Sequence, residues 1–221
     1  MFYTKKSVRH IYGNMKKLYD LFSECLNIPY TTVGVSASYA VRREGNALFI
    51  FFEGSNGAND WKNNLDFPAK VHPHADGDYF AHRGFLRTWQ EIEPHLAPAI
   101  AEKSIRQMTV VGYSHGGAVA TLCHEAIWRS RPDLRERIEG YGFGAPRVFW
   151  GRRSRALLER WTRYTVVRNE NDLVTHLPPA LLGYSHVGKL LSIGERGKYT
   201  AIEAHLSQNI LTELSRYEKD L

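Results

Sequence analysis

The sequence predicts an α/β fold in which a mostly parallel central sheet is covered by helices on both faces. Short β-branched and aromatic runs alternate with longer segments of helical periodicity through the middle of the chain, which is typical of strand–helix–strand units. A chain of 221 residues can bury one large core, and no linker-like stretch divides it. Near the centre, a strand-like run ends in Gly-x-Ser-x-Gly and a helix-like run follows. We therefore expect one domain over residues 1–221.

The first third of the chain should supply a helix and a hairpin. Residues 4–27 carry apolar side chains at three- and four-residue steps and predict an amphipathic helix that ends before Pro29. Residues 33–42 and 47–53 predict a β-hairpin whose second strand is buried. We expect a short helix over 61–66 and irregular structure over 67–82.

The remaining elements should alternate. Residues 84–103 have the period of a helix, which Pro94 and Pro98 should break or kink. Further strands are expected over 108–113, 138–144, 164–168 and 186–193, and further helices over 115–130, 153–162 and 199–219.

The centre of the chain reads Gly112-Tyr-Ser114-His-Gly116 after a β-branched run. A serine on so sharp a turn has strained dihedrals, and the positions two before and two after it lack room for a side chain. The turn holds the Ser114 hydroxyl clear of the backbone and aims the first helix amides, including that of His115, at the oxygen of an attacked carbonyl. The pattern predicts a nucleophilic serine, against the alternative of a chance glycine-rich loop.

A serine nucleophile needs an acid and a base later in the chain, in the order Ser, Asp or Glu, His. Asp172 follows a β-branched strand, where a carboxylate can hold an imidazole in one tautomer. We prefer it to Asp133, which sits in an Arg-rich turn beside a proline, and to Glu170. A loop carboxylate that caps a turn is the non-catalytic alternative for Asp172.

Three histidines follow this acid in the sequence. His205 should lie near the start of the last helix, where the chain can return to the sheet edge, so we expect it to be the base. His176 is too close to Asp172 to fold back at the correct angle, and His186 has the surroundings of a strand residue.

One loop contains residues that could bind a metal, namely His72, His74, Asp76 and Asp78. A His-Pro-His run beside Asp-Gly-Asp is more typical of ordinary turns, and no helical histidine pair accompanies it. We therefore expect no metal and no other cofactor.

The chain has a net charge of +6, much of it in clusters over 5–17 and 147–168. A nucleic-acid site would need aromatic residues between the charges or a recognition motif, and neither is present. We expect solvated helix faces, with weak attraction to anionic lipid head groups as a second possibility. Cys25 and Cys123 imply no disulfide framework, and Cys123 should be buried. Neither a signal-peptide pattern nor a membrane-length apolar run is seen, which predicts a cytoplasmic protein without a transmembrane segment.

Six ordered motifs carry a family resemblance. They are Phe51-Phe-Glu-Gly-Ser55 with Asp60-Trp61 and Asn64-Leu-Asp-Phe67, His82-Arg-Gly-Phe85, Gly112-Tyr-Ser-His-Gly116-Gly, Tyr141-Gly-Phe-Gly-Ala-Pro-Arg147, Asn171-Asp172 with Leu177-Pro-Pro, and His205. Over residues 33–205 the chain thus resembles the class 3 (fungal-type) lipase family of the α/β-hydrolase superfamily.

The resemblance implies an α/β-hydrolase fold and a serine carboxylic-ester hydrolase that acts on lipid-like acyl esters without a cofactor. It implies a triad of Ser114, Asp172 and His205, and an oxyanion hole from Ser55 and the amide of His115. It also implies a lid over about 57–66, which includes Asn59, Asp60 and Trp61.

Three features depart from the family pattern. Glu53 stands where the family commonly has Arg, the interval from Asp172 to His205 is only 33 residues (205 − 172), and the lid segment is mostly polar. Because the lid segment is mostly polar, strong interfacial activation is not expected. A catalytically silent lipid-surface or protein-binding module on the same fold, and a phospholipase or acyltransferase with the same residues, remain as alternatives.

Overall fold

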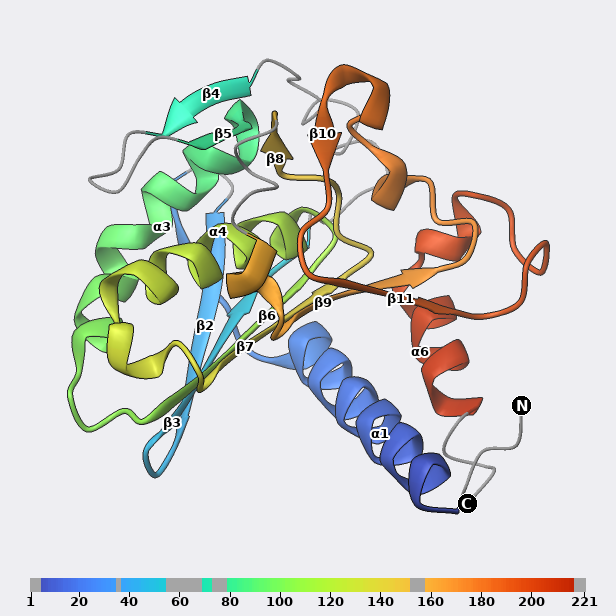
Figure 1. Cartoon of the computed structure of the whole chain (residues 1–221), viewed down its shortest axis with the longest axis horizontal. Coiled ribbons are helices and arrows are strands. Elements are labelled where there is room, and N and C mark those ends of the chain that lie inside the picture. The colour runs from blue at the N-terminus through green and yellow to red at the C-terminus, as the bar shows by residue number, and fades with distance from the viewer. Residues whose placement is uncertain (1–4, 35–36, 55–68, 73–78, 152–157, 217–221) are drawn as a thin grey trace.

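The computed structural model describes residues 5–34, 37–54, 69–72, 79–151 and 158–216. Within these ranges the largest sheet has seven strands in the order β1-β2-β3-β6-β7-β9-β11 (Figure 1). Its strands are β1 (Thr31–Val33), β2 (Ala37–Glu44), β3 (Ala47–Phe52), β6 (Gln107–Tyr113), β7 (Ile138–Phe143), β9 (Tyr164–Asn169) and β11 (Lys189–Ile193). The five strands β3, β6, β7, β9 and β11 run parallel to one another, whereas β2 is antiparallel to both β1 and β3.

The predicted hairpin is confirmed by the pairing of β2 with β3. Glu44 pairs with Ala47 across a turn in which Gly45 has a φ of +57°. On its other side β3 pairs in parallel with β6, and this register places Phe52 opposite Gly112. The end of the hairpin therefore lies beside the Gly-x-Ser-x-Gly turn.

Helices cover both faces of this sheet, which confirms the predicted fold class. Helices α1 (Lys5–Asn27) and α6 (Ser207–Arg216) lie on one face, and α3 (Arg83–Ala101) and α4 (His115–Ser130) lie on the other (Figure 1). Alternate strand residues serve the two cores. Phe51 packs with α1 and α6, and Ile50 and Phe52 pack with α3 and α4.

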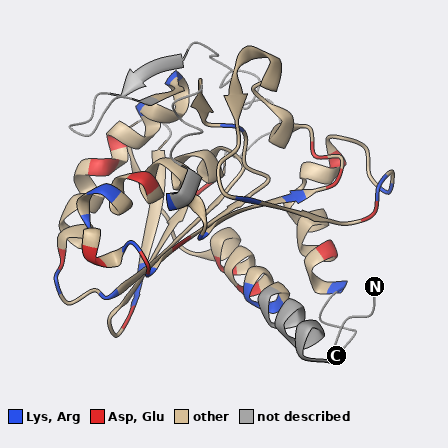
Figure 2. Cartoon of the chain, viewed as in Figure 1, with Lys and Arg blue, Asp and Glu red and all other residues tan. Residues whose placement is uncertain are grey.

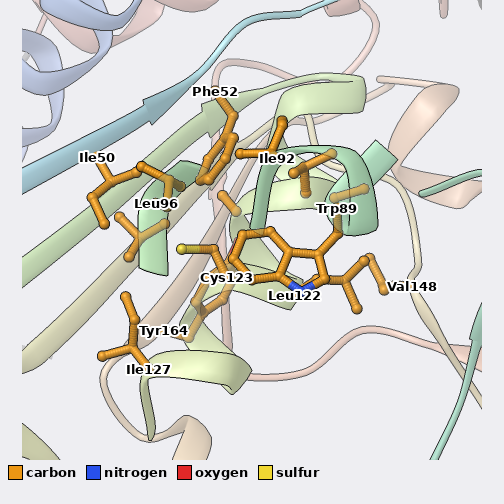
Figure 3. Packing of buried hydrophobic residues seen from close by; sticks show 14 of the residues in the cluster. Ile50, Phe52, Trp89, Ile92, Leu96, Leu122, Cys123, Ile127, Val148 and Tyr164 are labelled. Atoms are coloured by element: carbon orange, nitrogen blue, oxygen red, sulfur yellow. The ribbon is translucent and has the colours of Figure 1, made fainter. Parts of the chain in front are cut away.

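The core under α3 and α4 is dense with large apolar side chains. Figure 3 shows Trp89, Ile92 and Leu96 of α3 meeting Leu122 and Ile127 of α4 over the sheet residues. Cys123 lies among them as a buried free thiol, as predicted, and Cys25 is a buried free thiol in the other core.

Helix α3 runs without interruption through Pro94 and Pro98, so the prediction of a break is wrong. Both prolines are exposed, while the six predicted apolar residues from Phe85 to Ile100 are all buried. Burial of each large apolar side chain contributes roughly 1.5–3 kcal/mol, and six of them outweigh a cost of roughly 3 kcal/mol for each proline.

Residues 67–82 were expected to be irregular, and this is wrong for their described part. Strands β4 (Ala69–His72) and β5 (Tyr79–His82) pair, and with β8 (Phe149–Trp150) and β10 (Tyr184–Ser185) they form a second, four-stranded sheet in the order β10-β8-β5-β4. These strands have two to four residues each, which is too short for an alternating pattern to be recognised.

The last predicted helix is shorter than expected. Residues 203–205 form a separate 3₁₀ turn, Leu206 is extended, and α6 begins only at Ser207. The expected strand over 186–193 likewise begins at Lys189. The described 3₁₀ segments are η1 (Pro132–Leu134), η2 (Leu158–Trp161), η3 (Val174–His176), η4 (Ala180–Leu182) and η5 (Glu203–His205). Of the helix predicted over 153–162, only the part from residue 158 is described, and it is 3₁₀.

The lid over 57–66 and the short helix over 61–66 lie outside the described residues. No helix in the part of the chain that the structure describes has the length and apolar character needed to span a bilayer.

Candidate active site

Strand β6 passes directly into helix α4 at Ser114, which has a φ of 52° and a ψ of −121°. Among the described residues, Ser114 is the only non-glycine residue with a positive φ. A Cβ at Gly112 would lie 2.1 Å from the carbonyl oxygen of Gly116, and a Cβ at Gly116 would lie 2.3 Å from that of Phe52. Both positions therefore require glycine, as the spacing of the motif predicts.

The structure brings Ser114, His205 and Asp172 into one hydrogen-bonded line. Nε2 of His205 lies 2.8 Å from Oγ of Ser114. Nδ1 of the same ring lies 3.0 Å from each carboxylate oxygen of Asp172. Asp172 is completely buried, and the side chain of His205 is 15% exposed. The imidazole thus faces a carboxylate on one side. On the other side it faces the Ser114 hydroxyl at the sharp strand-to-helix turn from Gly112 to Gly116 (the elbow).

The chain around Asp172 holds its carboxylate in place. The backbone N–H of Val174 donates to Oδ1 at 2.9 Å. The Thr175 hydroxyl donates to the Asp172 carbonyl oxygen at 2.8 Å, and the Asp172 N–H donates to the Asn169 carbonyl at the end of β9. A carboxylate fixed in this way can orient the ring that it contacts.

Gly144 is a supporting residue whose role the sequence analysis missed. It follows β7, has a φ of +56°, and donates its N–H to the Val167 carbonyl at 2.8 Å. A Cβ here would lie 2.9 Å from Cε1 of His205 and 3.0 Å from Oδ2 of Asp172. The signal in the sequence was the second glycine of Tyr-Gly-Phe-Gly, directly after a predicted strand.

The other histidines considered as the base make structural contacts. Nδ1 of His176 donates to the backbone carbonyl of Asp172 at 2.9 Å, and its side chain is exposed. Nε2 of His186 donates to the Thr175 carbonyl at 2.7 Å, and burial lowers the pKa of His186 to about 4.

The other carboxylates considered as the acid make no hydrogen bond or ion pair with His205 in the described part of the chain. Asp133 pairs with the buried Arg131 at 2.8 Å, and this hydrogen-bonded pairing lowers the pKa of Asp133 to about 2. Glu170 donates its backbone N–H to the Ile193 carbonyl in the neighbouring strand.

The predicted oxyanion hole is described on one side only. His115 is the first residue of α4, where backbone amides have no partners within the helix. The imidazole of His115 has a different environment from its amide. Burial lowers the pKa of this imidazole to about 4, and its Nε2 lies 3.4 Å from Oγ1 of Thr88. Ser55, Asn59, Asp60 and Trp61 lie outside the described residues.

No cluster of three or more potential metal ligands occurs in the ranges that the structure describes. His72 lies in β4, whereas His74, Asp76 and Asp78 of the same candidate site fall outside those ranges.

Basic and acidic residues are interspersed along the described helices, strands and loops (Figure 2). In the second basic cluster, Arg160 pairs with the buried Glu125 at 2.9 Å. In the first cluster, Lys17 pairs with Glu139. The Lys17–Glu139 pair is solvent-exposed, as a solvated face requires, whereas the Arg160–Glu125 pair is buried, so Arg160 does not belong to the solvated face predicted for the second cluster.

Comparison with known proteins identifies a matching family and relatives over part of the chain. The family model Lipase (class 3) matches residues 49–182. The lipase of Rhizomucor miehei is 31% identical over an alignment of 154 residues that covers 64% of this chain and 40% of that protein. The secreted mono- and diacylglycerol lipase 1 of Fusarium solani is 27% identical over 160 residues, 71% of this chain and 46% of that protein. The chain thus spans about half the length, or less, of these relatives.

Solved structures show the same fold. The triacylglyceride lipase of Rhizomucor miehei superposes with a TM-score of 0.69 at 22% identity over 87% of this chain and 82% of that one. A fungal lipase–inhibitor complex superposes with a TM-score of 0.73 at 20% identity over 95% of this chain and 96% of that one.

The expected cytoplasmic location is contradicted by these relatives. Those from Fusarium solani and Penicillium cyclopium are described as secreted. An export signal is a segment separate from the folded domain, so the composition of the domain does not report its location.

The family match covers more than half of the chain and includes Ser114 and Asp172. The fold, the glycine-flanked elbow and the ordered motifs agree with that match. The chain belongs to the class 3 lipase family.

Proposed function

We propose that this chain is a serine carboxylic-ester hydrolase that acts on acylglycerol-type lipid esters. The observation that carries the proposal is the hydrogen-bonded line from Ser114 through His205 to Asp172, which starts at a strained strand-to-helix turn. This is the arrangement that activates a serine hydroxyl toward a carbonyl carbon.

In the proposed mechanism, Nε2 of His205 accepts the proton of the Ser114 hydroxyl as its oxygen attacks the ester carbonyl. Asp172, fixed by Val174 and Thr175, stabilises the imidazolium that forms. His205 then donates the proton to the leaving alcohol, and an acyl-enzyme on Ser114 remains. Water hydrolyses this intermediate by the same steps in reverse, and the serine is regenerated.

The amide of His115 at the start of α4 is the proposed donor to the oxyanion, with Ser55 as its partner. The contact of Gly54 supports the pairing of these two donors. A Cβ at Gly54 would lie 2.7 Å from the Tyr113 ring, so the chain passes directly beside the elbow as it leaves β3. Each oxyanion donor typically contributes about 3 kcal/mol to lowering the barrier.

A catalytically silent module on the same fold is disfavoured by the same geometry. The strained φ of Ser114 and the burial of Asp172 would cost free energy without benefit to a binding surface. An acyltransferase or phospholipase would use the same residues, so the products decide between these reactions and hydrolysis of acylglycerols.

The choice of acylglycerols rests on what the relatives are named, namely a triacylglyceride lipase and secreted mono- and diacylglycerol lipases. An extracellular place of action is proposed on the same basis. A net charge of +6 supports a weak additional attraction to anionic lipid head groups. Sedimentation with anionic and with zwitterionic vesicles at two salt concentrations tests this attraction, which should weaken with salt.

The test of the proposed function is a rate series on mono-, di- and triacylglycerols and on p-nitrophenyl esters of increasing chain length. Wild type is compared with Ser114→Ala and with Ser130→Ala, a matched control at the exposed far end of α4, where the hydroxyl only donates to the Ala126 carbonyl. Hydrolysis should be abolished in the first variant and unchanged in the second. Equal rates for wild type and Ser114→Ala would exclude the proposal, and transfer of the acyl group to an alcohol in place of water would favour the acyltransferase.

A further inference from the structure

Tyr113 precedes Ser114 in the chain and contacts the histidine that serves the same site. Its hydroxyl donates to the backbone carbonyl oxygen of His205 at 2.7 Å. Its ring also stacks on the His205 imidazole, with centroids 5.3 Å apart and planes 22° from parallel. One side chain therefore contacts both the backbone and the ring of the proposed base.

The bonded carbonyl belongs to His205, two residues before α6 begins at Ser207. Burial raises the pKa of this tyrosine, so its hydroxyl keeps its proton and remains a donor. Tyr113 thus links the elbow strand to the short connection between His205 and α6.

The ring of Tyr113 is itself held from two other directions. Phe22 of α1 meets it edge-on, with centroids 5.5 Å apart, and Phe22 in turn stacks on Phe143 at 4.4 Å. Gly54 packs closely against its edge, since a Cβ there would lie 2.7 Å from Cδ1. A ring enclosed in this way has little freedom to turn, and it can hold what it contacts.

The connection that carries His205 needs such support. His205 belongs to a 3₁₀ turn of three residues, closed by local bonds such as that from its N–H to the Ile202 carbonyl. The side-chain amide of Asn169 donates a hydrogen bond of 3.1 Å to the backbone carbonyl of Ala204, the residue before His205. A short turn of this kind is easily displaced, whereas a base must stay within about 0.5 Å of its productive position.

We propose that Tyr113 is a positioning residue that holds His205 between Ser114 and Asp172 through its hydroxyl bond to the His205 carbonyl and through ring stacking. The expected effect on kcat rests on the proposed function, because His205 is the base of that reaction. The expected effect on the position of the His205 ring does not depend on the reaction.

The test is Tyr113→Phe, which removes the hydroxyl and keeps the ring. The matched control is Tyr141→Phe on the neighbouring strand, where the lost hydroxyl bonds Glu139 and has no contact with the triad in the described structure. Loss of one neutral hydrogen bond that orients the base should lower kcat roughly three- to tenfold at an unchanged KM in Tyr113→Phe. Tyr141→Phe should keep the wild-type kcat.

A second measurement is independent of catalysis. The proton between Nδ1 of His205 and Asp172 is followed by NMR and identified by its loss in Asp172→Ala. In Tyr113→Phe this resonance should shift and exchange faster with solvent, whereas it should stay unchanged in Tyr141→Phe. Wild-type kcat together with an unaltered resonance in Tyr113→Phe would overturn the proposal. An inactive wild type with the expected change in the resonance would instead count against the proposed function and leave the positioning role in place.

Discussion

Replacing Gly144 with alanine should lower the rate of ester hydrolysis far more than a stability loss of the same size elsewhere in the fold would. The added methyl carbon would lie 2.9 Å from Cε1 of His205, 3.0 Å from Oδ2 of Asp172 and 3.0 Å from Nδ1 of His205. Carbon needs about 3.5 Å or more from such neighbours, so the imidazole and the carboxylate have to move apart from their present contact by several tenths of an ångström. Displacement by about 1 Å is worth on the order of a hundredfold in rate, and complete loss of the aspartate's support is worth about 10⁴-fold. We expect kcat to fall roughly a hundredfold.

The control for this change is Gly45→Ala in the hairpin turn. Gly45 has a φ of +57°, against +56° for Gly144, and a Cβ there would meet nothing within 4 Å. Both variants therefore carry the same left-handed backbone penalty, about 1–2 kcal/mol, and only one of them intrudes on the site. Urea denaturation and ester hydrolysis are measured on both. Equal rates in the two variants, at equal stability, would refute the assigned role of Gly144.

Three further changes test other parts of the structure. Asp172→Asn should reduce kcat roughly 10⁴-fold because the imidazole loses the partner that fixes its tautomer, which steady-state kinetics on a soluble ester will measure; a loss below tenfold would argue against this acid. Arg131→Met should lower the free energy of unfolding by about 2–4 kcal/mol, because the buried guanidinium donates to three backbone carbonyls within residues 100–105 and pairs with Asp133; its rate per folded molecule should stay at the wild-type value. Burial lowers the pKa of His124 to about 3 in the folded protein, below the usual 6.5, so the unfolded chain takes up the proton first and stability falls as the pH drops from about 6.5 toward 3. Between neutral pH and pH 4.5 the free energy of unfolding of the wild type should therefore fall by about 3 kcal/mol more than that of His124→Leu. Parallel stability–pH curves for the two proteins would contradict this.

The parts of the site that follow from local constraints were predictable from the sequence. A Gly-x-Ser-x-Gly turn between a strand and a helix needs its glycines for steric reasons within one turn, and the structure shows them packed against Gly116 and Phe52 backbone atoms. Asp172 was predicted to lie near Ser114 because carboxyl ends of parallel strands meet at one edge of the sheet, and its carboxylate does lie 3.0 Å from Nδ1 of His205. The alternation of Ile50, Phe51 and Phe52 between the two cores follows from the same local rule.

The parts that depend on distant partners were not predictable. Gly144 matters because the end of β7 meets His205, a contact that no local pattern contains. The apolar steps at Ile202 and Leu206 indicated a helix from residue 199. Ile202 is 58% exposed and Leu206 37%, and neither belongs to the two buried clusters, so the helix starts later. Local propensity also misjudged α3, where long-range burial outweighs the cost of its two prolines.

The position of α1 has a consequence for synthesis of the chain. Its apolar face packs against β6 and α6, which are translated much later, and Phe22 within it backs Tyr113 and Phe143. During translation this face therefore stays uncovered until the last parallel strands and α6 have left the ribosome, which leaves the nascent chain prone to aggregation until then. The contact between Ser114 and His205 likewise forms only after residue 205 has been made, so the proposed nucleophile should be inactive in an unfinished chain.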